Sequence, residues 1–226
     1  MAILSIDTTM NGCSVGLYHT ETFLLAEESL EMSRGQAEQL MPMIETVLER
    51  AELKYDGIDH IAVTKGPGAF TGMRIGLATA KSLALALDIP VTGVCTFQAV
   101  LRSYLDRDSA RTSPYFGVLL ETKRQDFYFQ MFRGKNPCSD KVSAAAAEII
   151  CMIDGQECLM IGDVAERFKA EIGRMDNLLF ESLLMPSSVA ITKVALESEG
   201  QGLCDPVYVR PPDVGRPKNP PRKIRQ

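Results

Sequence analysis

Three closely spaced glycines in the sequence GPGAFTG are the residues of this chain that point most directly to chemistry. Gly66, Gly68 and Gly72 lie between apolar runs at residues 61–64 and 70–87, and Pro67 restricts the turn between the first two. A strand that delivers glycines to a helix N-terminus can bind an anion, because free backbone N–H groups and the helix dipole point to the same place. The pattern therefore predicts either an anion-binding loop or a tight turn without a ligand.

Known nucleotide-binding fingerprints do not fit this loop. The GxGxxG pattern requires glycine where the chain has Thr71, and the P-loop pattern fails at the same residue. Asp7 ends an apolar run at residues 2–6, and a short acidic side chain in that place can cap its own turn. Neither the loop nor Asp7 decides the function by itself.

Histidine and cysteine chemistry finds little support in the sequence. His19 and His60 are far apart and lack the spacing of metal ligands, and no GxSxG elbow exists to pair with either of them. The six cysteines form no CxxC pair, so we expect small buried side chains rather than a zinc or redox site. We therefore predict no metal site and no catalytic residue in this chain.

Charge and hydropathy limit the classes of partner. The net charge of −5 argues against a general nucleic-acid-binding surface. Charged residues interrupt the most apolar segment, so no run is long enough to span a bilayer, and no N-terminal signal pattern is present. We expect a cytoplasmic protein without a membrane partner.

Two apolar helices are predicted in the first half of the chain. Residues 70–87 carry only two charges, Arg74 and Lys81, which is typical of a helix covered on more than one side. Residues 33–53 form an amphipathic pattern interrupted by Pro42, so we expect a kink or a helix start there.

The order of elements predicts two lobes. Strands are expected at residues 2–6, 13–18, 23–27, 61–64 and 91–94, followed by a helix at 95–106. A polar stretch near Asp108 marks the boundary, so residues 1–107 form one lobe and residues 108–210 a smaller one. In the smaller lobe, strands are expected at 115–121, 127–132 and 158–161, with a last edge strand at 205–210, and helices at 144–152, 164–172 and 187–199. Residues 211–226 are rich in proline and basic residues and are expected to be disordered.

This arrangement resembles the ribonuclease-H-like fold of actin-like ATPases and sugar kinases. The fold class that it implies is α/β, with a mixed sheet flanked by helices in each lobe and a degenerate second lobe. In such proteins the aspartate at the end of the first strand positions a metal-bound water or a phosphate.

Several sequence blocks together resemble the TsaB (YeaZ) family. They are IDTT, CSVGLY, EQLMPMIETVL, GPGAFTGMRIGLATAKSLA, IPVTGVCT and PVYVR, and they extend over almost the whole chain before residue 211. The resemblance implies a non-catalytic, dimerising subunit of the complex that makes threonylcarbamoyladenosine at position 37 of tRNA. The implied partners are the catalytic paralogue TsaD or a second copy of the chain, with TsaE in a larger assembly and tRNA contacted through the complex.

The family's pairing helices correspond here to residues 33–53 and 70–87. The residues expected at the partner interface are Leu40, Met43, Ile44, Val47, Met73, Gly76, Leu77, Ala80 and Ala84.

The chain differs from its catalytic relatives at residues that bind metal and phosphate there. These differences imply no metal binding and at most weak nucleotide binding. The two metal-binding histidines of TsaD are absent from the corresponding residues 95–100, and the second phosphate loop, at residues 121–124, has no glycine. We expect no required cofactor and at most weak binding of ATP or ADP. The residues expected to contribute to that binding are Asp7, Thr8, Thr9, Gly66, Gly68 and Gly72.

An alternative function is a free-standing actin-like ATPase or small-molecule kinase, which would use Asp7 and the glycine loop. It predicts turnover of ATP by the isolated chain.

Overall fold

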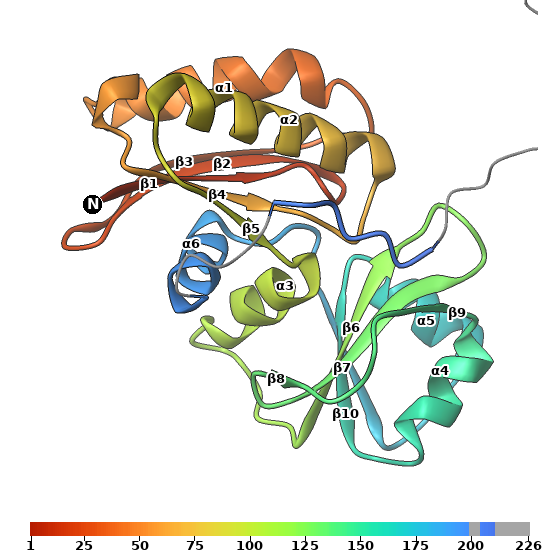
Figure 1. Cartoon of the computed structure of the whole chain (residues 1–226). Coiled ribbons are helices and arrows are strands. Elements are labelled where there is room, and N and C mark those ends of the chain that lie inside the picture. The colour runs from red at the N-terminus through yellow and green to blue at the C-terminus, as the bar shows by residue number, and fades with distance from the viewer. Residues whose placement is uncertain (199–203, 211–226) are drawn as a thin grey trace, which may run out of the picture.

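A computed structural model describes residues 1–198 and 204–210 of the chain. Within these residues the strands form a five-stranded and a six-stranded sheet, one in each of two lobes (Figure 1). The predicted tail at 211–226 lies outside the described residues, and the predicted lobe boundary stays a prediction.

The first sheet has the strand order β3-β2-β1-β4-β5. Strands β1 (Ala2–Asp7), β2 (Gly12–His19) and β3 (Phe23–Glu31) form an antiparallel meander. Strands β4 (His60–Thr64) and β5 (Val91–Val94) continue the sheet parallel to β1. Parallel pairing brings the carboxyl ends of β1 and β4 to the same edge of the sheet.

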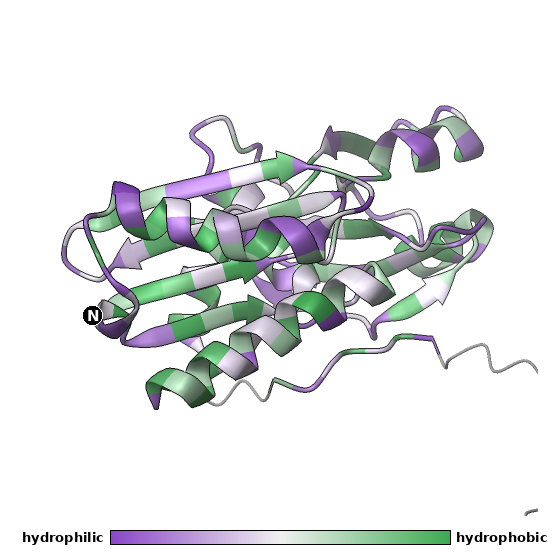
Figure 2. Ribbon diagram, turned by 90° about the horizontal axis from the view of Figure 1, so that it is seen from above, coloured by the Kyte–Doolittle hydropathy of each residue, from purple (hydrophilic) through white to green (hydrophobic). Residues whose placement is uncertain are grey.

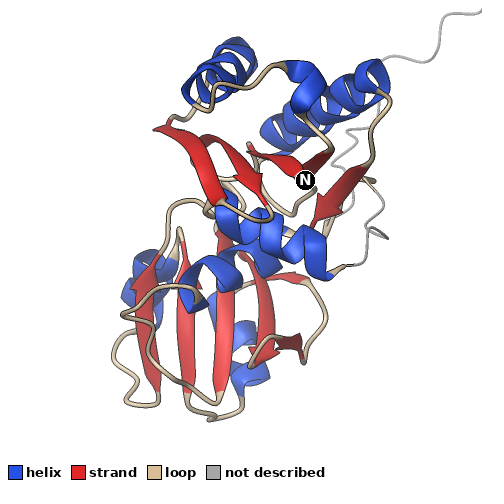
Figure 3. Ribbon diagram, turned by 90° about the vertical axis from the view of Figure 1, so that its left-hand side faces the viewer, coloured by secondary structure: helices blue, strands red, loops and turns tan. Residues whose placement is uncertain are grey.

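Helices cover both faces of the first sheet (Figure 3). On one face, α1 (Gln36–Arg50) packs on β2 and β3, and α2 (Phe70–Leu87) packs on β4 and β1. On the other face, α6 (Ser188–Glu197) packs on β1, β2, β4 and β5, beside α3 (Thr96–Leu105). A short 3₁₀ turn, η1 (Tyr55–Gly57), precedes β4.

The second sheet has the order β11-β10-β6-β7-β8, with β9 paired to β7. Its strands are β6 (Tyr115–Glu121), β7 (Phe127–Arg133), β8 (Asn136–Pro137), β9 (Val142–Ala144), β10 (Cys158–Gly162) and β11 (Leu178–Ser182). Helices α4 (Ala146–Ile153) and α5 (Ala165–Ile172) pack on one face, and α3 packs on β6 and β10. Both helices of this lobe have 8 residues, against 15 and 18 in α1 and α2.

Three predicted features differ from the structure. Helix α1 starts after Gly35 and not at Pro42, because the buried face of the helix holds it on the sheet while Pro42 itself is exposed. A kink at Pro42 stays a prediction. Residues 205–210 form no strand; the Val207 N–H instead donates to the Lys65 carbonyl oxygen (2.7 Å). Strands β8, β9 and β11 were not predicted, because their apolar runs are short, and β9 includes Ala144, where a helix was expected to begin.

Candidate functional site: the seam between the two lobes

Asp7 lies at the end of β1 and is fully buried. Its Oδ1 accepts hydrogen bonds from the Thr9 N–H (3.1 Å), the Thr9 hydroxyl (2.6 Å) and the Thr64 hydroxyl (2.6 Å). Its Oδ2 has no hydrogen-bond partner among the described residues. Burial raises the pKa of Asp7, although the hydrogen bonds from Thr64 and Thr9 act in the opposite direction. The carboxylate thus closes its own turn and ties β1 to β4.

This geometry predicts a measurable role for the Thr64 hydroxyl. Thr64→Val is expected to lower the free energy of unfolding by about 1–2 kcal/mol, because a buried carboxylate oxygen loses a hydrogen-bond donor. Thr64→Ser retains the hydroxyl and is the matched control. Urea denaturation at pH 7 measures both, and equal stability of the two variants would contradict the role.

The glycines of the loop fit against the turn after β1. A Cβ at Gly68 would lie 2.1 Å from the Thr9 carbonyl oxygen, and one at Gly72 would lie 2.0 Å from the Thr8 carbonyl oxygen. The Ala69 N–H donates to the Thr9 carbonyl (2.7 Å), and the Thr8 hydroxyl donates to the Gly72 carbonyl (2.7 Å). The chain's own turn therefore occupies the space that the missing side chains leave.

Gly66 has a different reason to be glycine. Its φ is +97°, and a Cβ there would lie 2.9 Å from the Val207 carbonyl oxygen. The structure thus brings the six residues predicted to bind a nucleotide into one cluster at the edge of the first sheet. The nucleotide itself stays a prediction, because their mutual contacts explain their residue types without a ligand.

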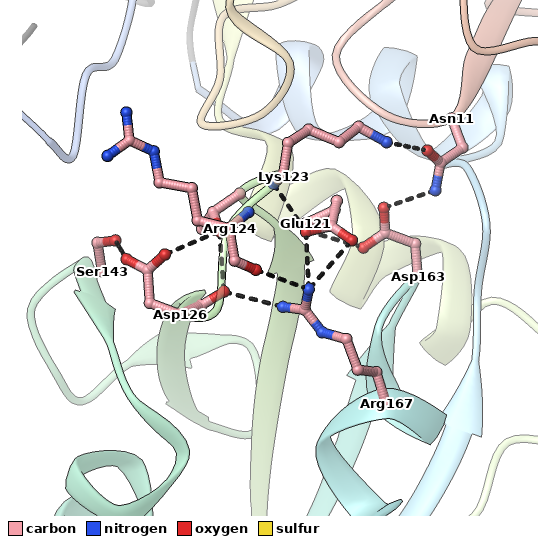
Figure 4. A network of polar contacts seen from close by, with 9 residues as sticks. Asn11, Glu121, Lys123, Arg124, Asp126, Ser143, Asp163 and Arg167 are labelled. Atoms are coloured by element: carbon pink, nitrogen blue, oxygen red, sulfur yellow. Dashed lines mark hydrogen bonds and ion pairs between the residues drawn. The ribbon is translucent and has the colours of Figure 1, made fainter. Parts of the chain in front are cut away.

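Side chains from both lobes meet across the seam beside this cluster (Figure 4). Asn11 Nδ2 donates to Asp163 Oδ2 (3.0 Å), and Lys123 Nζ donates to Asn11 Oδ1 (3.1 Å). Asp163 Oδ1 accepts from the Glu121 N–H (3.1 Å). The cavity between these groups and Gly68 has a volume of about 10 Å³. The seam is therefore closed by the chain's own polar groups.

Asp163 is an unusual carboxyl group within this seam. Burial raises its pKa to about 7, and the negative charge of Glu121 acts in the same direction, while the hydrogen bond from the Glu121 N–H acts against it. Near neutral pH the Asp163 carboxyl group therefore gains or loses its proton. The hydrogen bond that it accepts from Asn11 changes in strength with that protonation.

Arg167 holds the β6–β7 hairpin that supplies Glu121 and Lys123 to the seam. Its guanidinium donates to Glu121 Oε1 (3.1 Å), to the Arg124 carbonyl (3.0 Å) and to the Asp126 carbonyl (2.8 Å), and it lies 4.2 Å from the Phe127 ring centroid. Sequence reasoning missed Arg167, Asn11, Lys123 and Asp163. The available signal was weak, because only Gly162 followed by Asp163 after an expected strand resembles the end of β1.

The nine residues predicted at the partner interface are all buried in the core of the first lobe. They are Leu40, Met43, Ile44, Val47, Met73, Gly76, Leu77, Ala80 and Ala84. A side chain enclosed by its own chain is not available to a partner, so these residues are core residues. Periodicity identified the apolar face of each helix but could not tell which neighbour covers it. A partner on these helices stays a prediction and would use their exposed residues.

The described residues hold neither a cluster of metal ligands nor a membrane-spanning helix. No group of three histidine, cysteine, aspartate or glutamate side chains in residues 1–198 and 204–210 is placed to hold a metal ion. Over the same residues, no helix is both long and apolar enough to cross a membrane.

Comparison with known proteins places the chain in a family. The family model of TsaD, described as tRNA N6-adenosine threonylcarbamoyltransferase, matches residues 29–187. The tRNA threonylcarbamoyladenosine biosynthesis protein TsaB of Bacillus subtilis is 30% identical over 142 residues, which cover 63% of this chain and 59% of that protein. The Escherichia coli protein of the same name is 33% identical over 110 residues, with 49% and 47% coverage. The chain thus spans about half the length of these curated relatives.

Solved structures agree on the fold. YeaZ from Pseudomonas aeruginosa superposes with a TM-score of 0.77 at 22% identity, covering 92% of this chain and 99% of that one. The ROK hexokinase from Thermus thermophilus superposes with a TM-score of 0.50 at 12% identity, covering 88% and 100%. The predicted fold class, two lobes with mixed sheets flanked by helices as in actin-like ATPases, is confirmed. The chain belongs to the TsaD family, and the relatives and solved structures that it resembles within that family carry the names TsaB and YeaZ.

Proposed function

We propose that this chain is a non-catalytic subunit of the complex that makes N6-threonylcarbamoyladenosine in tRNA, and that it binds and supports the catalytic paralogue TsaD. In the absence of TsaD, the chain would pair with a second copy of itself. TsaE joins the larger assembly, and the complex acts in the cytoplasm. The family match over residues 29–187 and the names of the curated relatives support this role.

The observation that carries the proposal is the closure of the seam directly beside the turn after β1. An actin-like ATPase needs space between its lobes for the phosphates of the nucleotide. Here Asn11, Lys123 and Asp163 bridge the lobes next to that turn, and the cavity beside these three residues, of about 10 Å³, is near the minimum that one water molecule needs. The larger space between the lobes, of about 540 Å³, lies at the N-terminal turn of α2 instead. The closure beside the turn favours a supporting role over the alternative of a free-standing ATPase or kinase.

The outward face of α2 offers the surface that a partner needs. The exposed residues Thr71, Arg74, Ala78, Ser82 and Leu85 recur at helical spacing on this helix, and Leu85 is 86% exposed. Arg74 and Lys81 are the two charged residues of this exposed surface. Figure 2 shows that α2, along the lower edge of the view, carries few strongly hydrophilic residues. Small and apolar residues on an exposed face permit close approach of another helix.

A charge placed on this face tests the proposal. Ala78→Arg is expected to weaken binding to TsaD from the same organism at least tenfold, because a long charged side chain would be desolvated between two helices. Ala170→Arg is the matched control, since Ala170 is exposed on α5 in the other lobe. Size-exclusion chromatography with light scattering, together with titration calorimetry, measures pairing.

ATP hydrolysis by the isolated chain is assayed in parallel and is expected to be absent. Turnover of ATP by the chain alone, with no complex formed with TsaD, would refute the proposal. Equal affinity of the Ala78→Arg and Ala170→Arg variants would place the interface elsewhere.

A further inference from the structure

A second cavity, of about 540 Å³, lies beside the seam. It borders the face of α2 proposed to meet TsaD, because Arg74 lines the cavity and lies four residues before Ala78. The N-terminal turn of α2, the β6–β7 hairpin and residues 204–210 form its walls. Figure 1 shows residues 204–210, in blue, passing from the first lobe toward this hairpin. A cavity of this volume is in the range of small-ligand sites, which is about 300–1,000 Å³.

The lining of this cavity is basic in a chain of net charge −5. Four basic side chains line it, and Glu121 is the one carboxylate among the described lining residues. The basic residues are Arg74, Lys123, Arg124 and Arg210. Glu121 is already paired with Arg167, and Arg210 is paired with Asp126 behind the lining. With both pairs counted, the four lining cations and Arg167 stand against two carboxylates, Glu121 and Asp126, so the cavity attracts anions.

Aromatic rings stand between these cations. Phe70 is 48% exposed and Tyr208 is 44% exposed, with their ring centroids 5.6 Å apart. The Arg74 guanidinium lies 3.8 Å from the Phe70 centroid, and its Nε donates to the Tyr208 hydroxyl (3.1 Å). A third ring, Tyr128, lines the cavity from the hairpin. Exposed rings alternating with cations are the pattern that binds unpaired bases and their phosphates.

We propose that this cavity binds single-stranded nucleic acid, with phosphates at the four basic side chains and a base stacked on Phe70 or Tyr208. This goes beyond the proposed function, because it assigns a direct nucleic-acid contact to this chain rather than to the assembled complex. An acidic peptide could satisfy the cations but would leave the rings without a stacking partner, and a duplex presents no unpaired base.

Fluorescence anisotropy on the full-length chain tests the proposal, with fluorescein-labelled 12-nucleotide oligouridylate and oligodeoxythymidylate as separate probes that distinguish RNA from DNA. Binding is expected with a dissociation constant of roughly 1–100 μM at low salt. For four phosphate contacts, the logarithm of the association constant should fall against the logarithm of salt concentration with a slope of about −3. A duplex RNA of equal length is expected to bind more weakly.

Matched variants locate the contact. Arg74→Glu is expected to weaken oligouridylate binding at least tenfold, whereas Arg174→Glu, an equal charge change at an exposed residue of the other lobe, should leave it within about twofold. Tyr208→Leu should weaken binding about fivefold or more, and Tyr208→Phe, which keeps the ring, should not. Lys123→Gln removes a second cation independently if Arg74→Glu fails to fold, as judged by circular dichroism.

Four outcomes would overturn the assignment. The first is that neither probe binds at 50 mM salt, and the second is that Arg74→Glu and Arg174→Glu weaken binding equally. The third is that binding is lost only when the basic residues 211–226 are removed. The fourth is that polyglutamate competes with the probe as strongly as unlabelled oligouridylate does. The last would identify an acidic protein as the occupant. Because these measurements need no partner, their failure is distinguishable from failure of pairing with TsaD.

Discussion

Between about pH 4 and pH 7 the wild type is expected to lose about 4 kcal/mol of its free energy of unfolding through Asp163. Replacing Asp163 with asparagine is expected to abolish that loss. The ordinary aspartate pKa is 3.8, and burial raises that of Asp163 to about 7. The two pKa values differ by about three, and a difference of one in pKa corresponds to about 1.4 kcal/mol, which gives this value. Asparagine stays neutral at every pH and keeps the shape of the side chain.

The direction of the effect follows from proton binding. Between about pH 4 and pH 7, folded Asp163 holds a proton that the unfolded chain releases. The contribution of this group to stability is therefore fully present near pH 4, falls as the pH rises, and is level above about pH 7. Asp7, whose pKa is raised in the same direction, remains in the variant, so the difference between the two proteins isolates Asp163.

Urea denaturation at half-unit pH steps from 4 to 8 measures the difference between wild type and Asp163→Asn. The exposed Asp176, whose side chain is 85% accessible, supplies the control Asp176→Asn, for which no such pH-dependent difference is expected. If Asp163→Asn and wild type lost stability in parallel over this range, the seam carboxyl would not hold a raised pKa.

Gly72→Ala is expected to lower the free energy of unfolding by about 3 kcal/mol, although alanine is ordinarily the better helix former. The added Cβ would lie 2.0 Å from the Thr8 carbonyl oxygen, which is backbone and cannot rotate away. Either α2 or the turn after β1 must shift, and the hydrogen bond from the Thr8 hydroxyl to the Gly72 carbonyl is lost with that shift.

Gly134→Ala provides the comparison for this substitution. Gly134 has a φ of +58°, but nothing lies within 4 Å of an added Cβ, so only backbone strain of about 1 kcal/mol is expected. Thermal and urea unfolding of both variants measure the gap. A Gly72→Ala protein as stable as Gly134→Ala would show that the loop and the turn are not tightly packed.

The fold was predictable where local signals agreed with one another. Helix α2 and strand β5 have the predicted bounds, because the glycine loop before the helix, Asp88 after it and Pro90 before the strand mark the ends. The meander of β1 to β3 was predictable from the apolar run at residues 2–6 and the turn signal Asn11-Gly12, although β3 extends four residues beyond the predicted end at 27.

The site was predictable only in part, because its contacts cross large separations in sequence. The grouping of Asp7 with the glycine loop was implied by the resemblance to actin-like ATPases, and the structure places both at the carboxyl ends of β1 and β4. Asn11, however, meets Asp163 across 152 residues, and no local pattern encodes such a pair. The predicted interface residues show another limit of periodicity: Leu77 and Ala80 lie on the apolar face of α2, and only the folded chain shows that its own sheet and α1 cover that face.

Helix α6 has a consequence for how this protein is made by the ribosome. It comes from residues 188–197, yet Ile191 and Ala195 pack with Ile3, Ala62 and Val94 of the first sheet. Until α6 leaves the exit tunnel, only α3, through Ala99, is available to cover part of that face of the nascent sheet. The first lobe therefore completes its folding late in translation, and a chaperone would find its exposed apolar strands during that interval.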